Sequence, residues 1–102
     1  MRKPVTIEGQ EITLATITVG DIETIELSGK SGRKFNIALV AASIRAAGDM
    51  ERGTEEWVRT VHVFSEVPGE DPSFQRLITA ANEVNGLSAP KGESGPAAPA
   101  AE

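Results

Sequence analysis

The stretch FNIALVAASIRAA occupies residues 35–47 and is followed directly by Gly48. Its alanine, leucine and isoleucine residues favour an α-helix, and the glycine favours the end of that helix. Apolar residues fall on two stripes of the predicted helix: Ile37, Val40 and Ile44 on one, and Phe35, Leu39 and Ala46 on the other. A helix that is apolar on nearly every side must be covered on more than one side. We therefore expect either the central helix of a small domain or a helix that borrows a partner for cover.

A β-hairpin is predicted at the N-terminal side of this helix. Residues 5–7 and 11–14 alternate between apolar and polar side chains and are rich in β-branched residues. Gly9, in the short turn between them, can adopt the positive φ that such turns need. We expect the second strand to continue to Ile17.

A short helix is predicted between the hairpin and the central helix. Thr18 and Asp21 have the spacing of a capping box, in which each side chain accepts a hydrogen bond from the backbone N–H of the other residue. Ile17 and Ile22 are spaced for a hydrophobic staple across the helix start. We expect this helix to run to Leu27, before a Ser-Gly pair that favours its end.

Two further helices are predicted after the central one. Thr54 can cap a short helix that contains Trp57 and begins with two glutamates, and acidic residues suit a helix N-terminus. A last helix with one apolar face is expected from Ser73 to about Asn85. A glycine at its C-cap and an apolar contact from Leu87 would close it.

These elements predict an α+β protein that is mainly α, with an N-terminal β-hairpin followed by three or four short helices. Residues 1–87 would form a single small globular domain. Residues 61–67 suit a strand by propensity, yet Trp57, Val61 and Phe64 fall at helical spacing, so helix and strand both remain open. Residues 88–102 are rich in alanine, proline and glycine and lack large apolar residues, so we expect a disordered tail.

Composition argues against several classes of function. The chain of 102 residues contains no cysteine and one histidine, which excludes disulfides and thiolate metal sites, and His62 cannot form a zinc site by itself. No signal peptide and no apolar run of about 18 residues, the length of a membrane span, is visible, so we expect a soluble cytoplasmic protein without membrane contact. No nucleophile or acid stands near His62 in a triad pattern, and the carboxylates are spread over helix starts and turns. We expect neither an enzyme nor a bound cofactor or metal.

The loop Gly29-Lys30-Ser31-Gly32 raises nucleic-acid binding as an alternative. It resembles the GxxG loop with which K-homology domains clamp a single-stranded backbone between two helices. Lys30, Arg33 and Lys34 would supply the positive charge. The formal net charge of −5 argues against this function, because an acidic protein repels a polyanion. A solvated loop between two helices is the simpler interpretation.

Four stretches occur along the chain in this order: TVGDIE at 18–23, NIALVAASIRAAG at 36–48, TEEWV at 54–58, and the segment from Phe74 to Leu87. Taken together, they resemble the small tail assembly chaperones of long-tailed bacteriophages. The resemblance implies an assembly factor in the cytoplasm of the host bacterium that coats the tape-measure protein, keeps it soluble and brings tail-tube proteins to it. Such proteins are absent from the finished virion. In many phages a ribosomal frameshift makes a longer version, and the predicted tail would be a natural linker to its extra domain.

The apolar helix suggests where a partner would bind, because helix-in-groove recognition needs an apolar surface. We expect the partner surface on residues 35–44 and on the helix around Trp57, formed by Phe35, Ile37, Leu39, Val40, Ile44 and Trp57. Packing of Trp57 into the core is the alternative for that residue. Self-association would be a second use of such a surface. A virion structural subunit, such as a connector or tube-associated protein, would have a similar composition.

Overall fold

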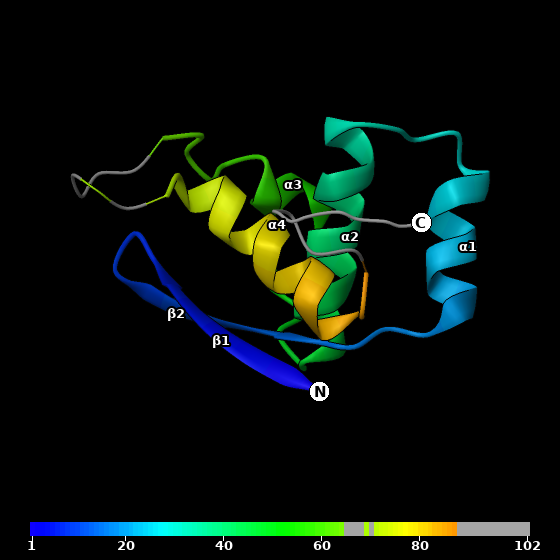
Figure 1. Ribbon diagram of the computed structural model, residues 1–102, viewed down its shortest axis with the longest axis horizontal. Helices are drawn as coiled ribbons and strands as arrows, with labels where there is room; N and C mark the ends of the chain where they lie inside the picture. Colours follow the sequence, from blue (N-terminus) through cyan, green and yellow to red (C-terminus); the bar gives the residue numbers. More distant parts are fainter. Residues whose placement is uncertain (65–68, 70, 88–102) are drawn as a thin grey trace.

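The chain forms an N-terminal β-hairpin followed by helices, which confirms the predicted α+β class. The computed structural model describes residues 1–64, 69 and 71–87. Within them, the elements in chain order are β1 (Arg2–Ile7), β2 (Gln10–Ala15), α1 (Val19–Leu27), α2 (Arg33–Ala46), α3 (Glu55–Val58) and α4 (Ser73–Val84), as Figure 1 shows. The predicted tail, residues 88–102, lies outside the described residues.

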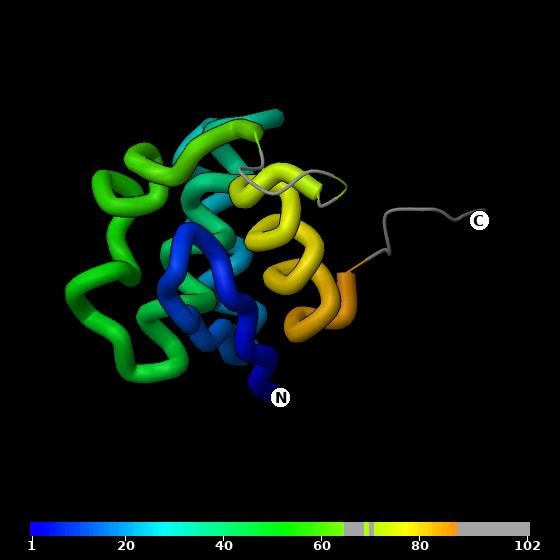
Figure 2. The backbone as a smooth tube through the Cα atoms, turned by 90° about the vertical axis from the view of Figure 1, so that its left-hand side faces the viewer, coloured from blue at the N-terminus to red at the C-terminus, as the bar shows by residue number. Residues whose placement is uncertain are grey.

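The two strands of the hairpin are joined by a turn of two residues. Ile7 lies opposite Gln10, and the intervening Glu8 and Gly9 both have positive φ, at 50° and 78°. Two such residues in succession form the turn whose twist matches that of paired strands. The hairpin lies in front of α2 in Figure 2, with α4 beside it.

The second strand ends at Ala15, so the prediction that it continues to Ile17 is wrong. Ala15 pairs with Arg2, and the N–H of Thr16 donates to the carbonyl of Met1 at 3.0 Å. The N–H of Ile17 instead donates to Oδ1 of Asn85 at 2.8 Å. A side chain from the far end of the domain therefore takes the backbone group that a longer strand would use.

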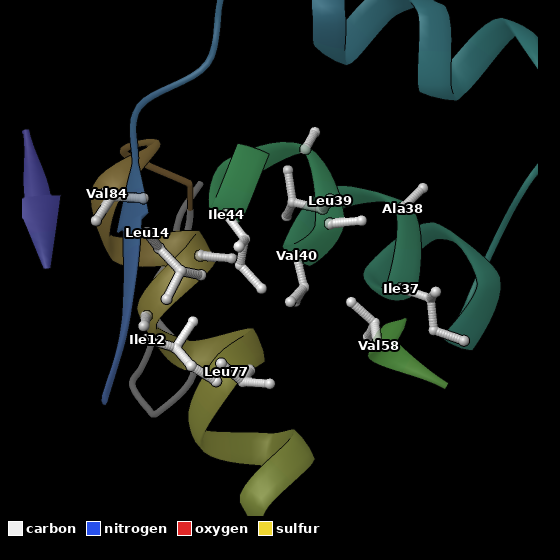
Figure 3. Close-up of a cluster of buried hydrophobic side chains, with 14 of the residues drawn as sticks. Ile12, Leu14, Ile37, Ala38, Leu39, Val40, Ile44, Val58, Leu77 and Val84 are labelled. Atoms are coloured by element: carbon white, nitrogen blue, oxygen red, sulfur yellow. The ribbon is translucent and has the colours of Figure 1, made fainter. Parts of the chain in front are cut away.

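Helix α2 is the central helix of the domain. It packs against β2, α1, α3 and α4, and every residue from Ile37 to Ile44 is buried. Figure 3 shows side chains from β2, α3 and α4 gathered around it, among them Leu14, Val58 and Leu77. The apolar surface of this helix left open whether the chain itself or a partner covers it. Within the described residues, the other elements of the chain cover it.

Two glycines set the limits of α2. The helix begins at Arg33, two residues before the predicted start, because Gly32 turns the chain at a φ of 59° and its carbonyl accepts the N–H of Asn36 at 3.1 Å. At the other end Gly48 adopts a φ of 101° and donates to the carbonyl of Arg45 at 2.9 Å. The predicted C-terminal stop at Gly48 is confirmed.

Helix α4 packs on β1, β2 and α2, with Leu77, Ala81 and Val84 buried. After its last residue, the N–H of Gly86 bonds to the carbonyl of Glu83 at 3.2 Å, and that of Leu87 to the carbonyl of Asn82 at 2.9 Å. This pair of bonds is a Schellman motif, and Leu87 packs against the core as predicted.

The predicted capping box of α1 is present. Thr18 Oγ1 accepts the N–H of Asp21 at 3.1 Å, and a carboxylate oxygen of Asp21 accepts the N–H of Thr18 at 3.2 Å. Among the described elements, the helix packs on α2 alone, with Ile25 buried, and lies on the side of α2 away from the hairpin (Figure 1).

Candidate functional site

Most of the predicted partner surface lies inside the core. Leu39, Val40 and Ile44 are 0% exposed, because β2, α1, α3 and α4 cover α2 from all sides. They cannot contact a partner in this conformation, so the prediction that places them on a partner surface needs correction. Phe35 and Trp57 are partly buried and pack against the core.

The sixth predicted residue, Ile37, lines a surface groove at the N-terminal end of α2. Three elements and the segment after α3 meet there: α2 supplies two basic residues, α3 and the following segment supply apolar ones, and α4 supplies a phenylalanine. We call this hollow of about 410 Å³ the basic groove; it is lined by Arg33, Lys34, Ile37, Val58, Arg59, Val61, Val63 and Phe74.

A second hollow adjoins the basic groove. It measures about 370 Å³ and shares Arg33, Val63 and Phe74 with it, while Pro72 and Ile78 bring in the start of α4. The two hollows together give the α2–α4 side of the molecule a concave surface with an apolar floor. Sites that hold small ligands or peptide side chains commonly have this form.

The charges around the basic groove are positive, although the chain is acidic overall. Arg33 and Lys34 are exposed, and neither forms an ion pair within the described part of the chain. Arg59 pairs with Glu55 at 3.3 Å, and the two side chains are 52% and 36% exposed. No side chain caps the start of α2, so its free N–H groups add to the positive potential. Among the residues that the structure describes, the lining contains no acidic one.

The basic residues of the predicted nucleic-acid loop have different surroundings in the structure. Nζ of Lys30 lies 3.9 Å from a carboxylate oxygen of Glu55, which also pairs with Arg59, and 3.5 Å from Ser28 Oγ. The loop does join two helices, as predicted, but Arg33 and Lys34 belong to α2 and line the groove, whereas Lys30 is not part of that lining.

Residues 61–64 form neither a helix nor a strand, and residues 65–67 of the ambiguous segment lie outside the described residues. Val61 is buried, whereas Val63 and Phe64 are 63% and 59% exposed. Val63 lines the groove, and Phe64 follows it in the chain. The sequence interpretation did not single out either of them as a partner residue. The sequence did contain a sign of them: they are large apolar residues in a segment whose pattern fits neither a helix nor a strand clearly.

His62 has a structural contact with the hairpin. Its backbone N–H and its Nδ1 both lie 3.0 Å from the same carboxylate oxygen of Glu8, 54 positions away in the sequence. The histidine therefore connects the hairpin turn to the segment that follows α3. Within residues 1–64, 69 and 71–87, no group of three or more His, Asp or Glu side chains is placed to hold a metal ion.

No family model, curated protein or solved structure matches this chain. None of the helices in the described part is long and apolar enough to cross a membrane. The basic groove and the two exposed apolar residues beside it are thus the candidate functional surface.

Proposed function

We propose that this protein is a tail assembly chaperone of a long-tailed bacteriophage. It would bind the tape-measure protein, keep it soluble and help to recruit tail-tube subunits in the cytoplasm of the host bacterium, without any catalytic step. The stretches that resemble this family support the proposal, because they fall in order on α1, α2, α3 and α4. They are therefore the helices of one domain rather than scattered matches.

The observation that carries a binding function is the apolar surface at the basic groove. Val63 is more than half exposed beside a floor that includes Ile37, and the next residue, Phe64, is exposed to a similar extent. Burying exposed apolar area of this kind on a client helix is favourable, by roughly 25 cal/mol for each Å² removed from water. The client surface of the chaperone is accordingly the basic groove, in place of Leu39, Val40 and Ile44.

Co-expression tests this function. A tape-measure fragment that is insoluble alone should become soluble when it is produced together with the full chain. The variant Val63→Asp should lose most of this effect, because it places a charge on the apolar surface. Val19→Asp is the matched control: Val19 is 74% exposed, and an acidic residue suits the start of α1, so the control should keep the effect.

Two results would count against the chaperone function. If the full chain leaves the solubility of the fragment unchanged, the protein does not protect this client. If the protein is a stoichiometric component of purified phage particles, it is a structural subunit of the virion instead.

A further inference from the structure

The floor of the basic groove calls for an apolar side chain. Val58 is 1% exposed, and Ile37 and Val61 are each 7% exposed, so the floor is made of aliphatic groups that belong to the core. Val63 and Phe74 form its apolar walls. The volume of about 410 Å³ lies within the roughly 300–1,000 Å³ that ligand pockets occupy. One or two aliphatic side chains of a partner would fill it.

The rim of the groove calls for negative charge. Arg33 and Lys34 have no ion partner within the residues described, and Arg59 is half exposed beside Glu55. This basic rim stands out on a chain whose formal net charge is −5. Charge complementarity at a rim raises the association rate and selects between partners.

We infer that the basic groove binds an acidic, apolar helical segment of a partner protein. Leucine or isoleucine side chains of the segment enter between Ile37 and Phe74, and glutamates or aspartates beside them pair with Arg33 and Lys34. The inference rests on the proposed function only for the identity of the partner, which would be the tape-measure protein. It defines which part of such a client is recognised, namely segments with acidic residues flanking an apolar stripe.

A peptide fits this surface better than a single-stranded nucleic acid. Bases bind by stacking on aromatic side chains, and Phe74 is the one aromatic side chain among the described residues of the groove lining. Lys30, which a GxxG loop would use, is held near Glu55. Nucleic acid is nevertheless one arm of the test.

The test measures binding of labelled probes to the full chain by fluorescence polarisation. The main probe is a short synthetic helical peptide with a leucine and isoleucine stripe flanked by glutamates. A second peptide replaces each glutamate by lysine, a third replaces the stripe by serine, and a single-stranded oligonucleotide is the fourth probe. The glutamate peptide should bind at least about tenfold more tightly than any other probe at physiological salt.

Charge reversal then locates the site. The double variant Arg33→Glu and Lys34→Glu should reverse the preference in favour of the lysine peptide, and glutamates in the first turn suit α2. The double variant Arg2→Glu and Lys3→Glu makes the same change of charge on the hairpin and should keep the original preference. Circular dichroism should show that both variants are folded.

Equal affinity for the glutamate and lysine peptides, or an unchanged preference in the Arg33→Glu and Lys34→Glu variant, would overturn the inference. Tighter binding of the oligonucleotide would overturn it in favour of a nucleic-acid site. The two proposals fail separately. If the peptide binds but the tape-measure fragment is not rescued, the chaperone function is wrong and the peptide-binding groove stands. If the fragment is rescued but the peptide does not bind, the chaperone function stands and the peptide-binding groove is wrong.

Discussion

The side-chain amide of Asn85 donates a hydrogen bond to the buried hydroxyl of Ser43, with Nδ2 and Oγ 3.0 Å apart. Oδ1 of the same amide accepts the N–H of Ile17 at 2.8 Å. One side chain at the end of α4 therefore connects the last turn of the central helix to the segment that leads into α1. Ser43 is 0% exposed, so its hydroxyl depends on partners within the protein.

Replacing Asn85 should be costly. Asn85→Ala removes a partner from the Ser43 hydroxyl and from the Ile17 N–H, and we expect the free energy of unfolding to fall by about 1–3 kcal/mol. Urea denaturation followed by circular dichroism measures it. Asn82→Ala is the control on the same helix, since the Asn82 side chain makes no hydrogen bond within the described residues; it should change stability by less than about 0.5 kcal/mol. If the two variants lose equal amounts of unfolding free energy, the hydrogen bonds of the Asn85 amide do not stabilise the fold beyond an ordinary surface residue.

Gly53 should not tolerate a side chain. A Cβ at this position would lie 2.6 Å from backbone atoms of Arg45, whose guanidinium also donates to the Gly53 carbonyl at 2.7 Å. We expect Gly53→Ala to lower the free energy of unfolding by about 1–3 kcal/mol, seen as a lower melting temperature. Gly20→Ala adds the same methyl group in α1, where the nearest atom is 3.8 Å away, and should be neutral or slightly stabilising. If the Gly53→Ala variant has the same melting temperature as the wild type, the predicted clash between a Cβ at position 53 and the backbone of Arg45 is wrong.

Leu39 should behave as a core residue. Leu39→Ala removes a side chain that is 0% exposed, so we expect a loss of about 2–5 kcal/mol in the free energy of unfolding. Leu27→Ala makes the same change where the side chain is 88% exposed and should cost less than about 0.5 kcal/mol. Chemical denaturation compares them. Similar small losses for the two variants would return Leu39 to the candidate partner surface.

Ionised Asp49 should stabilise the folded protein at neutral pH, and this contribution to the free energy of unfolding should be lost in acid. The backbone N–H of Arg52 is the main cause that lowers the pKa of Asp49 below its ordinary value of 3.8, and the Arg52 side chain adds to it at 2.6 Å. A lowered folded-state pKa stabilises the fold above the unfolded-state value, and this stabilisation is lost as pH falls through the folded-state pKa. Asp49→Asn should thus cost less than about 1 kcal/mol at pH 7, and its difference from wild type should shrink below pH 3.8.

The companion variant Arg52→Ala separates the two causes. This variant removes the guanidinium but keeps the backbone N–H. Much of the stabilisation that ionised Asp49 provides should therefore remain. Denaturation series from neutral to acidic pH give the comparison. A gap between wild type and Asp49→Asn that stays constant across this range would contradict the assignment.

Local signals in the sequence predicted the elements whose limits are set by nearby residues. The capping box of Thr18 and Asp21 and the stop at Gly86 both involve groups only a few positions apart. Such interactions depend on side-chain type and spacing, which a sequence displays directly. The hairpin, the capped helices and the C-terminal limits could therefore be predicted.

The features that could not be predicted depend on contacts between residues that are far apart in the sequence. Asn85 accepts the N–H of Ile17 just after β2, and Glu8 in the hairpin turn contacts His62, 54 positions along the chain. The basic groove likewise joins α2, α3, α4 and Val63, which are separated in sequence. The apolar pattern of α2 was compatible with an internal cover and with a partner, because periodicity measures apolarity and not what lies against it.

The position of α1 has a dynamic consequence. Among the described elements it rests on α2 alone, while α4 rests on three, so releasing α1 breaks a single interface. Helices held in this way are the first to open in local unfolding, at a free energy well below that of the whole domain. Amide hydrogens of α1 should accordingly exchange with solvent faster than those of α4. Each opening would leave one flank of the central helix briefly uncovered.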